Sequence, residues 1–181
     1  MNENKMNINW LTCIYDVLAC NMPTHFISIE EVNSMDKIIR KAVRTYLIED
    51  NKVVVINYKE HNNGYYDIPG GKIEDGETPE ETSIREFKEE TGITIKKQHY
   101  IGHNTIEYPD RIFEFEIYLV DDYFGEPLEF KENDSMWINI DNLYKEERLF
   151  PSIEVIKYLK NNMHVNIYCD SNHNIITIDE I

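Results

Sequence analysis

The chain has 181 residues, and its 34 acidic and 18 basic side chains give a formal net charge of −16 at pH 7. This length suits one domain that buries a full hydrophobic core. DNA- and RNA-binding proteins need a basic footprint for the phosphate backbone, and the composition offers none, which excludes a nucleic acid polymer as partner. A small phosphate ligand fits this charge when metal cations bridge it to the protein.

The cysteine and histidine content indicates a reduced, cytoplasmic protein. Cys13, Cys20 and Cys169 show no C-x-x-C spacing, and the six histidines show no zinc-binding pattern. Asp16 and several asparagines interrupt any apolar run near the N-terminus, so we expect no signal peptide. We expect no membrane partner either, because every apolar stretch is shorter than the roughly 20 residues that a membrane span needs.

Residues 1–36 are expected to form an N-terminal extension. A short amphipathic helix is predicted from apolar residues at helical spacing, namely Trp10, Leu11, Ile14, Val17 and Leu18. The segment from His25 to Val32 is open to two interpretations. It is either a lid that packs on the domain, or an element that forms a homodimer or selects the substrate.

From residue 37 the pattern changes to strands, which predicts the main domain at 37–163. Six strand-like runs are expected: Ala42 to Ile48, Val53 to Tyr58, Tyr65 to Ile68, Ile93 to Gly102, Ile112 to Val120 and Met136 to Ile140. The first two form a hairpin around Glu49 to Lys52. A closing helix is expected from Ser152 to Asn161, and residues 164–181 are predicted to pack on the domain as a C-terminal hairpin. Mixed strands with helices on both sides of a sheet predict an α/β (α+β) fold of the α/β/α sandwich type.

The sequence marks both ends of a helix between the third and fourth strands. Thr78 can cap this helix, Pro79 suits its first position, and Glu81 completes a capping box. Gly92 is a typical residue after a helix end, because glycine adopts the left-handed conformation without strain. The helix is therefore expected from about Pro79 to Thr91.

Three glutamates of this helix are expected to point in one direction. Glu86, Glu89 and Glu90 stand at positions i, i+3 and i+4, so their carboxylates share one face. Like charges this close repel one another, and a hard divalent cation such as Mg²⁺ compensates them through oxygen coordination. A less polar stripe is expected to face the core, and its members are Ile84, Phe87 and Thr91.

The segment from Gly71 to Ile93 follows the spacing G-x5-E-x7-R-E-Φ-x-E-E-x-G-Φ, where Φ is a bulky apolar residue. It resembles the signature of the Nudix hydrolases, which cleave nucleoside diphosphates linked to another group. The resemblance extends over roughly Ile38 to Asn161, and it implies the α/β/α sandwich and a Mg²⁺ or Mn²⁺ cofactor. One position departs from the family, since Phe87 stands where an aliphatic residue is usual, which changes core volume and leaves the implied ligands intact.

The resemblance also assigns roles within this motif. The implied metal ligands are the carbonyl of Gly71 and the carboxylates of Glu86, Glu89 and Glu90. The implied supporting residues are Gly70, Glu77 and Gly92, and Arg85 pairs with Glu77 to hold the loop against the helix. The implied catalytic group comprises Arg85, Glu86, Glu89 and Glu132. Either Glu89 or Glu132 is the base that activates water, and the sequence does not rank them.

A second segment is similar to the MutT-type branch of this family, which hydrolyses nucleoside triphosphates, including oxidised guanine forms, to the monophosphate and pyrophosphate. The similarity is carried by Tyr108-Pro109-Asp110-Arg111, Gly125-Glu126-Pro127, Lys131-Glu132 and Trp137. It implies that Arg111 and Ser152 contact the substrate, with Arg111 near the base. Two positions depart from the branch: the stretch Asn57 to Glu60 lacks an arginine, and Ser152 replaces an asparagine that often reads the purine. A hydroxyl offers fewer hydrogen bonds than an amide, which leaves the choice of purine open.

Other substrates also remain open. Pro109 lies sixteen residues after Ile93, as in some ADP-ribose-cleaving Nudix enzymes, and Tyr108 lies sixteen after Gly92, as in dinucleoside polyphosphate enzymes. Neither cue discriminates, because a turn before a strand explains both. We therefore expect a divalent-metal-dependent pyrophosphohydrolase acting on a nucleoside diphosphate-X substrate, with a nucleoside triphosphate, oxidised or not, as the leading candidate. ADP-ribose and dinucleoside polyphosphates are the alternative substrates, and a non-catalytic nucleotide sensor is the alternative from another class.

Overall fold

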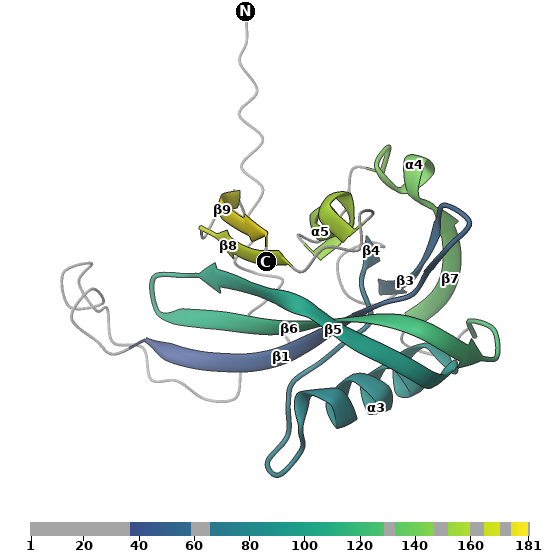
Figure 1. The fold of residues 1–181 in the computed structure, drawn as a ribbon, viewed down its shortest axis with the longest axis horizontal. Helices are drawn as coiled ribbons and strands as arrows, with labels where there is room; N and C mark the ends of the chain where they lie inside the picture. The colour runs from purple at the N-terminus through teal and green to yellow at the C-terminus, as the bar shows by residue number, and fades with distance from the viewer. Residues whose placement is uncertain are drawn as a thin grey trace, which may run out of the picture.

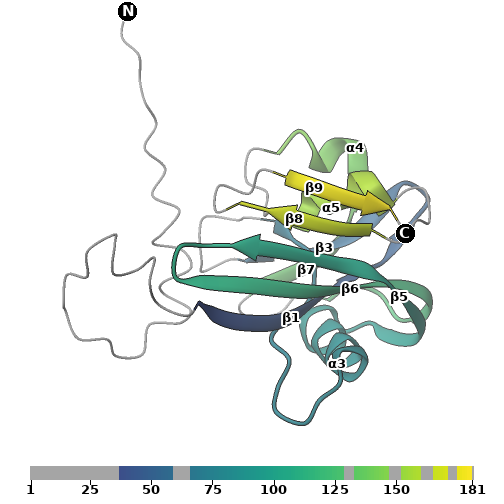
Figure 2. The same ribbon diagram turned by 60° about the vertical axis from the view of Figure 1, so that its left-hand side comes forward.

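The structure is a computed structural model that describes residues 37–58, 66–128, 133–146, 152–159, 165–170 and 175–180. The predicted N-terminal extension, residues 1–36, and the candidate base Glu132 lie outside the described residues. Within the described residues, two β-sheets form the body of the molecule. Helix α3 (Pro79–Thr91) lies on one side of the larger sheet and helix α5 (Ser152–Leu159) on the other (Figures 1 and 2). This arrangement confirms the expected α+β fold with a mixed sheet between helices.

In the described part of the chain, the larger sheet has five strands in the order β1-β6-β5-β8-β9. The strands are β1 (Ile38–Tyr46), β6 (Arg111–Phe124), β5 (Thr94–Glu107), β8 (Val165–Cys169) and β9 (Ile175–Glu180). β1 is parallel to β6 and β5 is parallel to β8, while the remaining neighbours are antiparallel. The predicted C-terminal hairpin is present as the pair β8–β9, and it joins the sheet through β5.

The smaller sheet is antiparallel and centres on β3 (Lys52–Tyr58). Its other strands are β2 (Ile48–Glu49), β4 (Tyr66–Asp67) and β7 (Asn133–Asn139), and each of them pairs with β3. The turn from β2 to β3 has positive φ values at Asp50 (49°) and Asn51 (60°), as a tight two-residue hairpin requires. The predicted hairpin is therefore confirmed. Its first strand, however, divides at Leu47, so that β1 belongs to the larger sheet and β2 to the smaller one.

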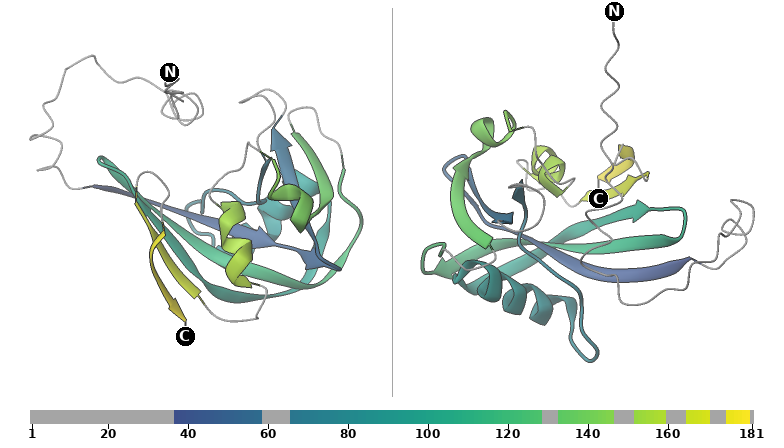
Figure 3. Two further views of the ribbon diagram at one scale, coloured as in Figure 1. Left: turned by 90° about the horizontal axis from the view of Figure 1, so that it is seen from above. Right: turned by 180° about the vertical axis from the view of Figure 1, so that it is seen from behind.

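Buried side chains in the described residues form two clusters. The right-hand view of Figure 3 shows α3 and α5 on opposite sides of the larger sheet. The larger cluster includes Ile153 and Ile156 of α5 together with Tyr46 and Ile68. The smaller cluster lies beneath α3 and includes Leu47, Val54, Phe87, Ile93, Ile95 and Val120. A short helix, α4 (Ile140–Leu143), follows β7 and was not predicted from the sequence pattern.

The buried stripe of α3 differs from the predicted one. Phe87 and Thr91 are buried as expected, but Ile84 is 39% exposed, so its predicted place in the core is wrong. Ser83 is buried in its place. Thr45 Oγ1 lies 2.6 Å from Ser83 Oγ, and the Ser83 hydroxyl donates to Gln98 Oε1 at 2.8 Å. These polar partners on β1 and β5 satisfy a buried hydroxyl and turn Ile84 away from the sheet.

Candidate functional site

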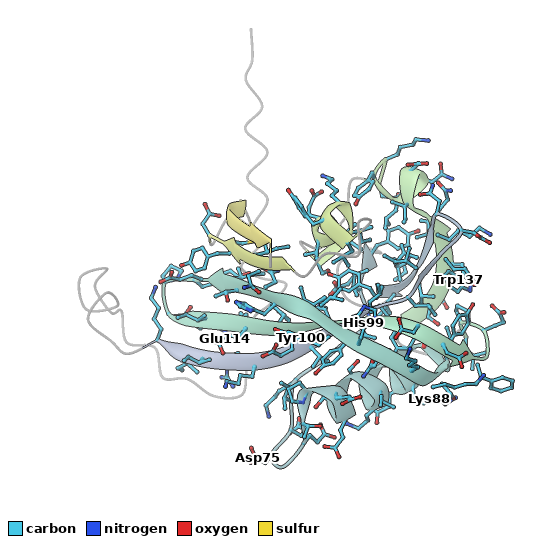
Figure 4. The ribbon with its side chains drawn as sticks, viewed as in Figure 1. Asp75, Lys88, His99, Tyr100, Glu114 and Trp137 are labelled. Atoms are coloured by element: carbon cyan, nitrogen blue, oxygen red, sulfur yellow. The ribbon has the colours of Figure 1, made fainter. Side chains whose placement is uncertain are left out.

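The helix that carries the glutamates begins and ends as predicted. The Thr78 hydroxyl accepts from the backbone N–H of Glu81 at 3.2 Å, and Glu81 Oε2 accepts from the backbone N–H of Thr78 at 2.9 Å. Gly92 has φ 78° and donates its N–H to the carbonyl of Lys88. Figure 4 labels Asp75, at the tip of the loop that leads into α3, and Lys88, in the last turn of the helix. The capping box and the glycine stop fix the register of α3.

The loop before this helix is held on β1 by backbone hydrogen bonds. Val43 N–H donates to the Gly71 carbonyl at 2.9 Å, and Thr45 N–H donates to the Pro69 carbonyl at 2.9 Å. Gly70 has φ 154°, and a Cβ atom there would lie 2.1 Å from the carbonyl oxygen of Val43. The loop therefore approaches β1 more closely than any residue with a side chain would permit.

Two of the predicted metal ligands contact this loop. Glu90 Oε2 accepts a hydrogen bond from the backbone N–H of Gly70 at 2.8 Å. The Glu86 carboxyl group lies against Gly71, because a Cβ atom on Gly71 would be 2.4 Å from the carboxyl carbon. The structure thus brings Gly70, Gly71, Glu86 and Glu90 together, although the loop and the helix are separate segments.

Arg85 connects the other charged residues of the motif. Its guanidinium pairs with Glu77 through two hydrogen bonds, Nε to Oε1 at 2.7 Å and Nη2 to Oε2 at 2.8 Å. Its Nη1 also donates to Glu86 Oε1 at 2.7 Å and to Glu89 Oε2 at 3.3 Å. The hydrogen bonds from Arg85 lower the pKa of Glu77 to about 2. The Arg85–Glu77 pair expected from the sequence is therefore present, and Arg85 bridges it to two of the candidate ligands.

The described residues hold no preformed metal cluster, since no three His, Cys, Asp or Glu side chains among them are grouped closely enough to bind an ion. Binding of one cation by the three carboxylates therefore stays a prediction. Glu86 and Glu89 bind Arg85, whereas Glu90 binds Gly70. The donor set still fits a hard cation, because all its ligand atoms are oxygens. The Gly71 carbonyl uses only one of its two lone pairs on Val43, and the Glu89 side chain is 60% exposed and has room to rotate.

The surroundings of Glu90 disfavour the ionised form of its carboxyl group. Burial of its carboxyl group raises the pKa of Glu90 to about 8, and the nearby charges of Glu86 and Asp67 act in the same direction. The Gly70 hydrogen bond and the positive charge of Arg44 oppose this shift without cancelling it. A buried carboxyl group surrounded by other acids is an environment that a bound cation relieves, which supports the fit of this site to a metal ion.

Replacing Glu90 by glutamine is expected to stabilise the cation-free protein at neutral pH. The folded-state pKa of about 8 lies above the ordinary glutamate value of 4.5, so the folded state holds this proton more tightly than the unfolded state. The stability linked to the proton is therefore present at low pH and is lost as pH rises toward about 8. In EDTA, urea unfolding should show wild type losing a few kcal/mol relative to Glu90→Gln between about pH 5 and 8. Parallel pH profiles for the two proteins would contradict this origin of the shift.

Ser152 and two residues that the sequence analysis missed form a buried network beside the loop. Asp67 is 3% exposed, and its Oδ2 accepts from Arg44 Nη2 at 3.0 Å. The Ser152 hydroxyl at the start of α5 donates to Asp67 Oδ1. Nothing in the sequence distinguishes Arg44 from Arg40 and Lys41 of the same strand or identifies Asp67 as its partner.

Arg111, the other predicted substrate contact, lies apart from the glutamates. It pairs with Asp110 beside the turn between β5 and β6, with Nε 3.0 Å from Oδ1. In the sheet register Arg111 lies opposite Ile38. Val43, whose backbone binds the loop, lies five residues after Ile38 on β1, which is roughly 16 Å at the usual rise of a strand. Arg111 therefore belongs to a different part of the molecule from the charged centre.

A row of aromatic rings extends between these two regions. Tyr108 packs edge-on against Phe113 with ring centroids 5.8 Å apart, and Phe113 stacks on Phe115 at 5.8 Å. The Arg44 guanidinium lies over the Phe115 ring, 4.9 Å from its centroid. The rings are only partly buried. The row of rings leads from the Arg111 end of the sheet to Arg44.

The sequence matches the NUDIX domain family over residues 39–158. The motif on α3, the preceding loop and the sheet together define a Nudix domain, and the chain belongs to the Nudix family. In the part of the chain that the structure describes, no helix has the length and apolar character to cross a membrane.

Several curated proteins are similar to the central part of this chain. The 8-oxo-dGTP diphosphatase of Haemophilus influenzae is 38% identical over 72 residues, which cover 40% of this chain and 53% of that protein. The 8-oxo-dGTP diphosphatase of Escherichia coli is 39% identical over 83 residues, or 45% and 63% of the two chains. The ADP-ribose pyrophosphatase of Methanocaldococcus jannaschii is 41% identical over 71 residues, or 39% and 41%. The matched segments span about half the length of these relatives.

Solved structures share the fold over a larger part of the chain. The MutT protein from Methanosarcina mazei Go1 superposes with a TM-score of 0.60 at 21% identity, covering 71% of this chain and 98% of that one. The MutT protein from Bacillus halodurans superposes with a TM-score of 0.59 at 17% identity, covering 78% and 97%. At these identities the likeness establishes the fold.

Proposed function

We propose that this chain is a divalent-metal-dependent pyrophosphohydrolase that cleaves a nucleoside diphosphate-X substrate. The leading substrate is a nucleoside triphosphate, oxidised or not, which yields the monophosphate and pyrophosphate. The observation that carries the proposal is the contact between loop and helix, where Gly71 lies against Glu86 and Gly70 binds Glu90. Membership of the Nudix family and the similarity to two 8-oxo-dGTP diphosphatases support it.

The proposed cation ligands are Gly71, through its carbonyl, and Glu86, Glu89 and Glu90. Members of the Nudix family generally require a divalent cation, and we propose Mg²⁺, or Mn²⁺ in its place. Such an ion supplies charge neutralisation at the phosphate oxygens during hydrolysis. The acidic helix face would otherwise repel a polyphosphate, because eight acidic and three basic residues lie between Gly71 and Ile93.

Within the described residues, Glu89 is the best placed proton acceptor for the attacking water. Its side chain is the most exposed of the three glutamates, and its contact with Arg85 is long at 3.3 Å. Arg85 orients Glu86 through a shorter hydrogen bond of 2.7 Å and is itself fixed by Glu77. Glu132, which lies outside the described residues, remains the alternative base.

The aromatic row supports a place for the nucleoside. A nucleobase stacked on Phe113 and Phe115 would lie between Arg111 and the loop, with its phosphates toward the glutamates. The Ser152 hydroxyl already donates to Asp67, so Ser152 contacts a base only by accepting a hydrogen bond. The similarity to an ADP-ribose pyrophosphatase keeps ADP-ribose as the second candidate substrate. A homodimer and a cytoplasmic location remain predictions.

The test is a hydrolysis screen over dNTPs, 8-oxo-dGTP, ADP-ribose and dinucleoside polyphosphates, with Mg²⁺ or EDTA. Wild type should hydrolyse at least one of them only with Mg²⁺, and Glu89→Gln should be slower by about 10²-fold or more. Glu80→Gln removes an equal charge from the exposed first turn of the same helix and should match wild type. Activity that persists in EDTA or in Glu89→Gln would overturn this site. Tight nucleotide binding without hydrolysis would indicate the sensor instead.

Replacing Arg85 by lysine is expected to reduce kcat by about 10- to 100-fold. Lysine keeps the positive charge but cannot pair with Glu77 through two parallel hydrogen bonds while also reaching Glu86. Steady-state kinetics on the best substrate of the screen measures the effect. The control is Arg40→Lys, an equivalent change at an exposed position of β1, which should leave kcat unchanged. Wild-type kcat in Arg85→Lys would show that charge alone is sufficient there.

A further inference from the structure

We propose that Arg44 is a positioning residue for the cation site, and that it acts through Asp67. Its ion pair with Asp67 fixes the loop that places Gly70 and Gly71 against Glu90 and Glu86. This inference rests on the proposed function, because it concerns the same cation site. It assigns a role to two residues outside the Gly71 to Ile93 motif.

Every oxygen of the Asp67 carboxylate has a defined partner. Oδ2 accepts from Arg44 Nη2 at 3.0 Å, and Oδ1 accepts both from the backbone N–H of Ile68 at 2.7 Å and from the Ser152 hydroxyl. The Asp67 side chain is 4% exposed, so water does not replace a lost partner readily. A buried carboxylate keeps its position only while its countercharge remains, and Arg44 supplies that countercharge.

Asp67 directly precedes the loop in the sequence. Arg44 lies on β1, between the two residues that bind the loop. Val43 and Thr45, the neighbours of Arg44 on β1, bind the Gly71 and Pro69 carbonyls through their backbone N–H groups. Those two bonds depend on the backbone alone. The Arg44 side chain adds a third attachment, because it binds Asp67, the last residue of β4 before the loop.

The Arg44 side chain is itself held in place, which makes it an effective anchor. Its guanidinium lies over the Phe115 ring of β6, 4.9 Å from the centroid, and its side chain is 19% exposed. The chain of contacts therefore runs from β6 through Arg44 and Asp67 to the loop, and from Gly70 to Glu90 at 2.8 Å. A loop displaced by about 1 Å would misplace both ligands that contact it.

The direction of the effect on cation affinity separates positioning from simple electrostatics. At a pH where the Glu90 carboxyl group is ionised, removing a positive charge near a cation site strengthens cation binding by Coulomb's law. If Arg44 positions the loop, its removal weakens binding in spite of that gain. The measurement is the Kd of Mn²⁺ for the substrate-free protein, followed by electron paramagnetic resonance, so the result does not depend on turnover.

We expect Arg44→Met to raise the Mn²⁺ Kd by about tenfold or more relative to wild type. The control is Arg40→Met, which removes the same charge from an exposed position of the same strand and should leave the Kd unchanged or slightly lower. Ser152→Ala removes one hydrogen bond to Asp67 without changing any charge, and it should raise the Kd by a smaller factor. A folded Arg44→Met protein with a Kd equal to or below that of wild type would overturn the proposal.

A second variant decides the question if Arg44→Met does not fold. Arg44→Lys keeps the charge but loses the planar guanidinium over Phe115, and it should also raise the Mn²⁺ Kd. A wild-type Kd in Arg44→Lys would then overturn the proposal. If wild type hydrolyses a substrate and binds Mn²⁺, and the Arg44 variants bind Mn²⁺ as wild type does, this inference fails while the proposed function stands. A wild-type protein that neither binds Mn²⁺ nor hydrolyses any substrate would remove the proposed function and this inference with it.

Discussion

Replacing Glu86 by glutamine should lower kcat by about 10³-fold or more while the melting temperature stays close to that of wild type. Glu86 lies against Gly71 and accepts from Arg85 at 2.7 Å, so it connects the loop, the arginine and the proposed cation. Glutamine has the same shape and retains an oxygen for Arg85, but it lacks the negative charge that the cation requires. The loss therefore reports on charge at this position and not on folding.

Steady-state hydrolysis and thermal unfolding, measured on the same preparation, test this result. Glu80→Gln, in the exposed first turn of the same helix, again provides the matched loss of one charge. If Glu86→Gln retained more than about a tenth of the wild-type kcat, Glu86 would not be a ligand of the reacting centre.

Replacing Gly70 by alanine should destabilise the protein by about 3 kcal/mol or more. A Cβ atom at Gly70 would lie 2.1 Å from the Val43 carbonyl oxygen, and both the loop and β1 are backbone that cannot move independently. The loop would have to leave β1, so Gly70→Ala should also lose hydrolysis. Urea unfolding gives the change in the free energy of unfolding.

Gly76→Ala is the matched control for this substitution. Gly76 also has a positive φ, 89°, but no atom would lie within 4 Å of an added Cβ. Its replacement should therefore show only the backbone strain of about 1 kcal/mol. Equal losses in the two variants would mean that left-handed backbone, and not close approach to β1, explains the requirement at Gly70.

Local features of the fold were predictable from the sequence, because their causes lie within a few residues. The helix from Pro79 to Thr91 begins at a capping box and ends at Gly92, and both signals are contained in the segment itself. The β2–β3 hairpin likewise depends on two residues, Asp50 and Asn51, that adopt positive φ. The spacing of Arg85 from Glu77 was sufficient to indicate their ion pair.

Features that depend on distant partners were not predictable in this way. Hydrophobicity favours Ile84 in the core, but Ser83 is buried beside Phe87 and Thr91 instead, where Thr45 and Gln98 offer hydrogen bonds to its hydroxyl. The pairing of Arg44 with Asp67 joins residues 23 positions apart, and no periodic pattern connects them. The division of the first predicted strand at Leu47 reflects packing, because Tyr46 and Leu47 enter different hydrophobic clusters.

The candidate site shows the same distinction between local and distant causes. The shared side of Glu86, Glu89 and Glu90 follows from helix geometry, whereas the partners of their carboxylates depend on the loop and on Arg85. Helical spacing therefore predicted that the three carboxylates share one side of the helix, but it did not predict that two of them turn toward an arginine.

We propose that this chain cleaves the bond between the α- and β-phosphates in a reaction that requires a divalent cation. The most direct measurement is a ³¹P NMR spectrum of the products from the nucleoside triphosphate that reacts fastest. We expect a nucleoside monophosphate and pyrophosphate in the presence of Mg²⁺, and unchanged triphosphate when EDTA is present. Orthophosphate together with a nucleoside diphosphate, or hydrolysis that continues in EDTA, would contradict it.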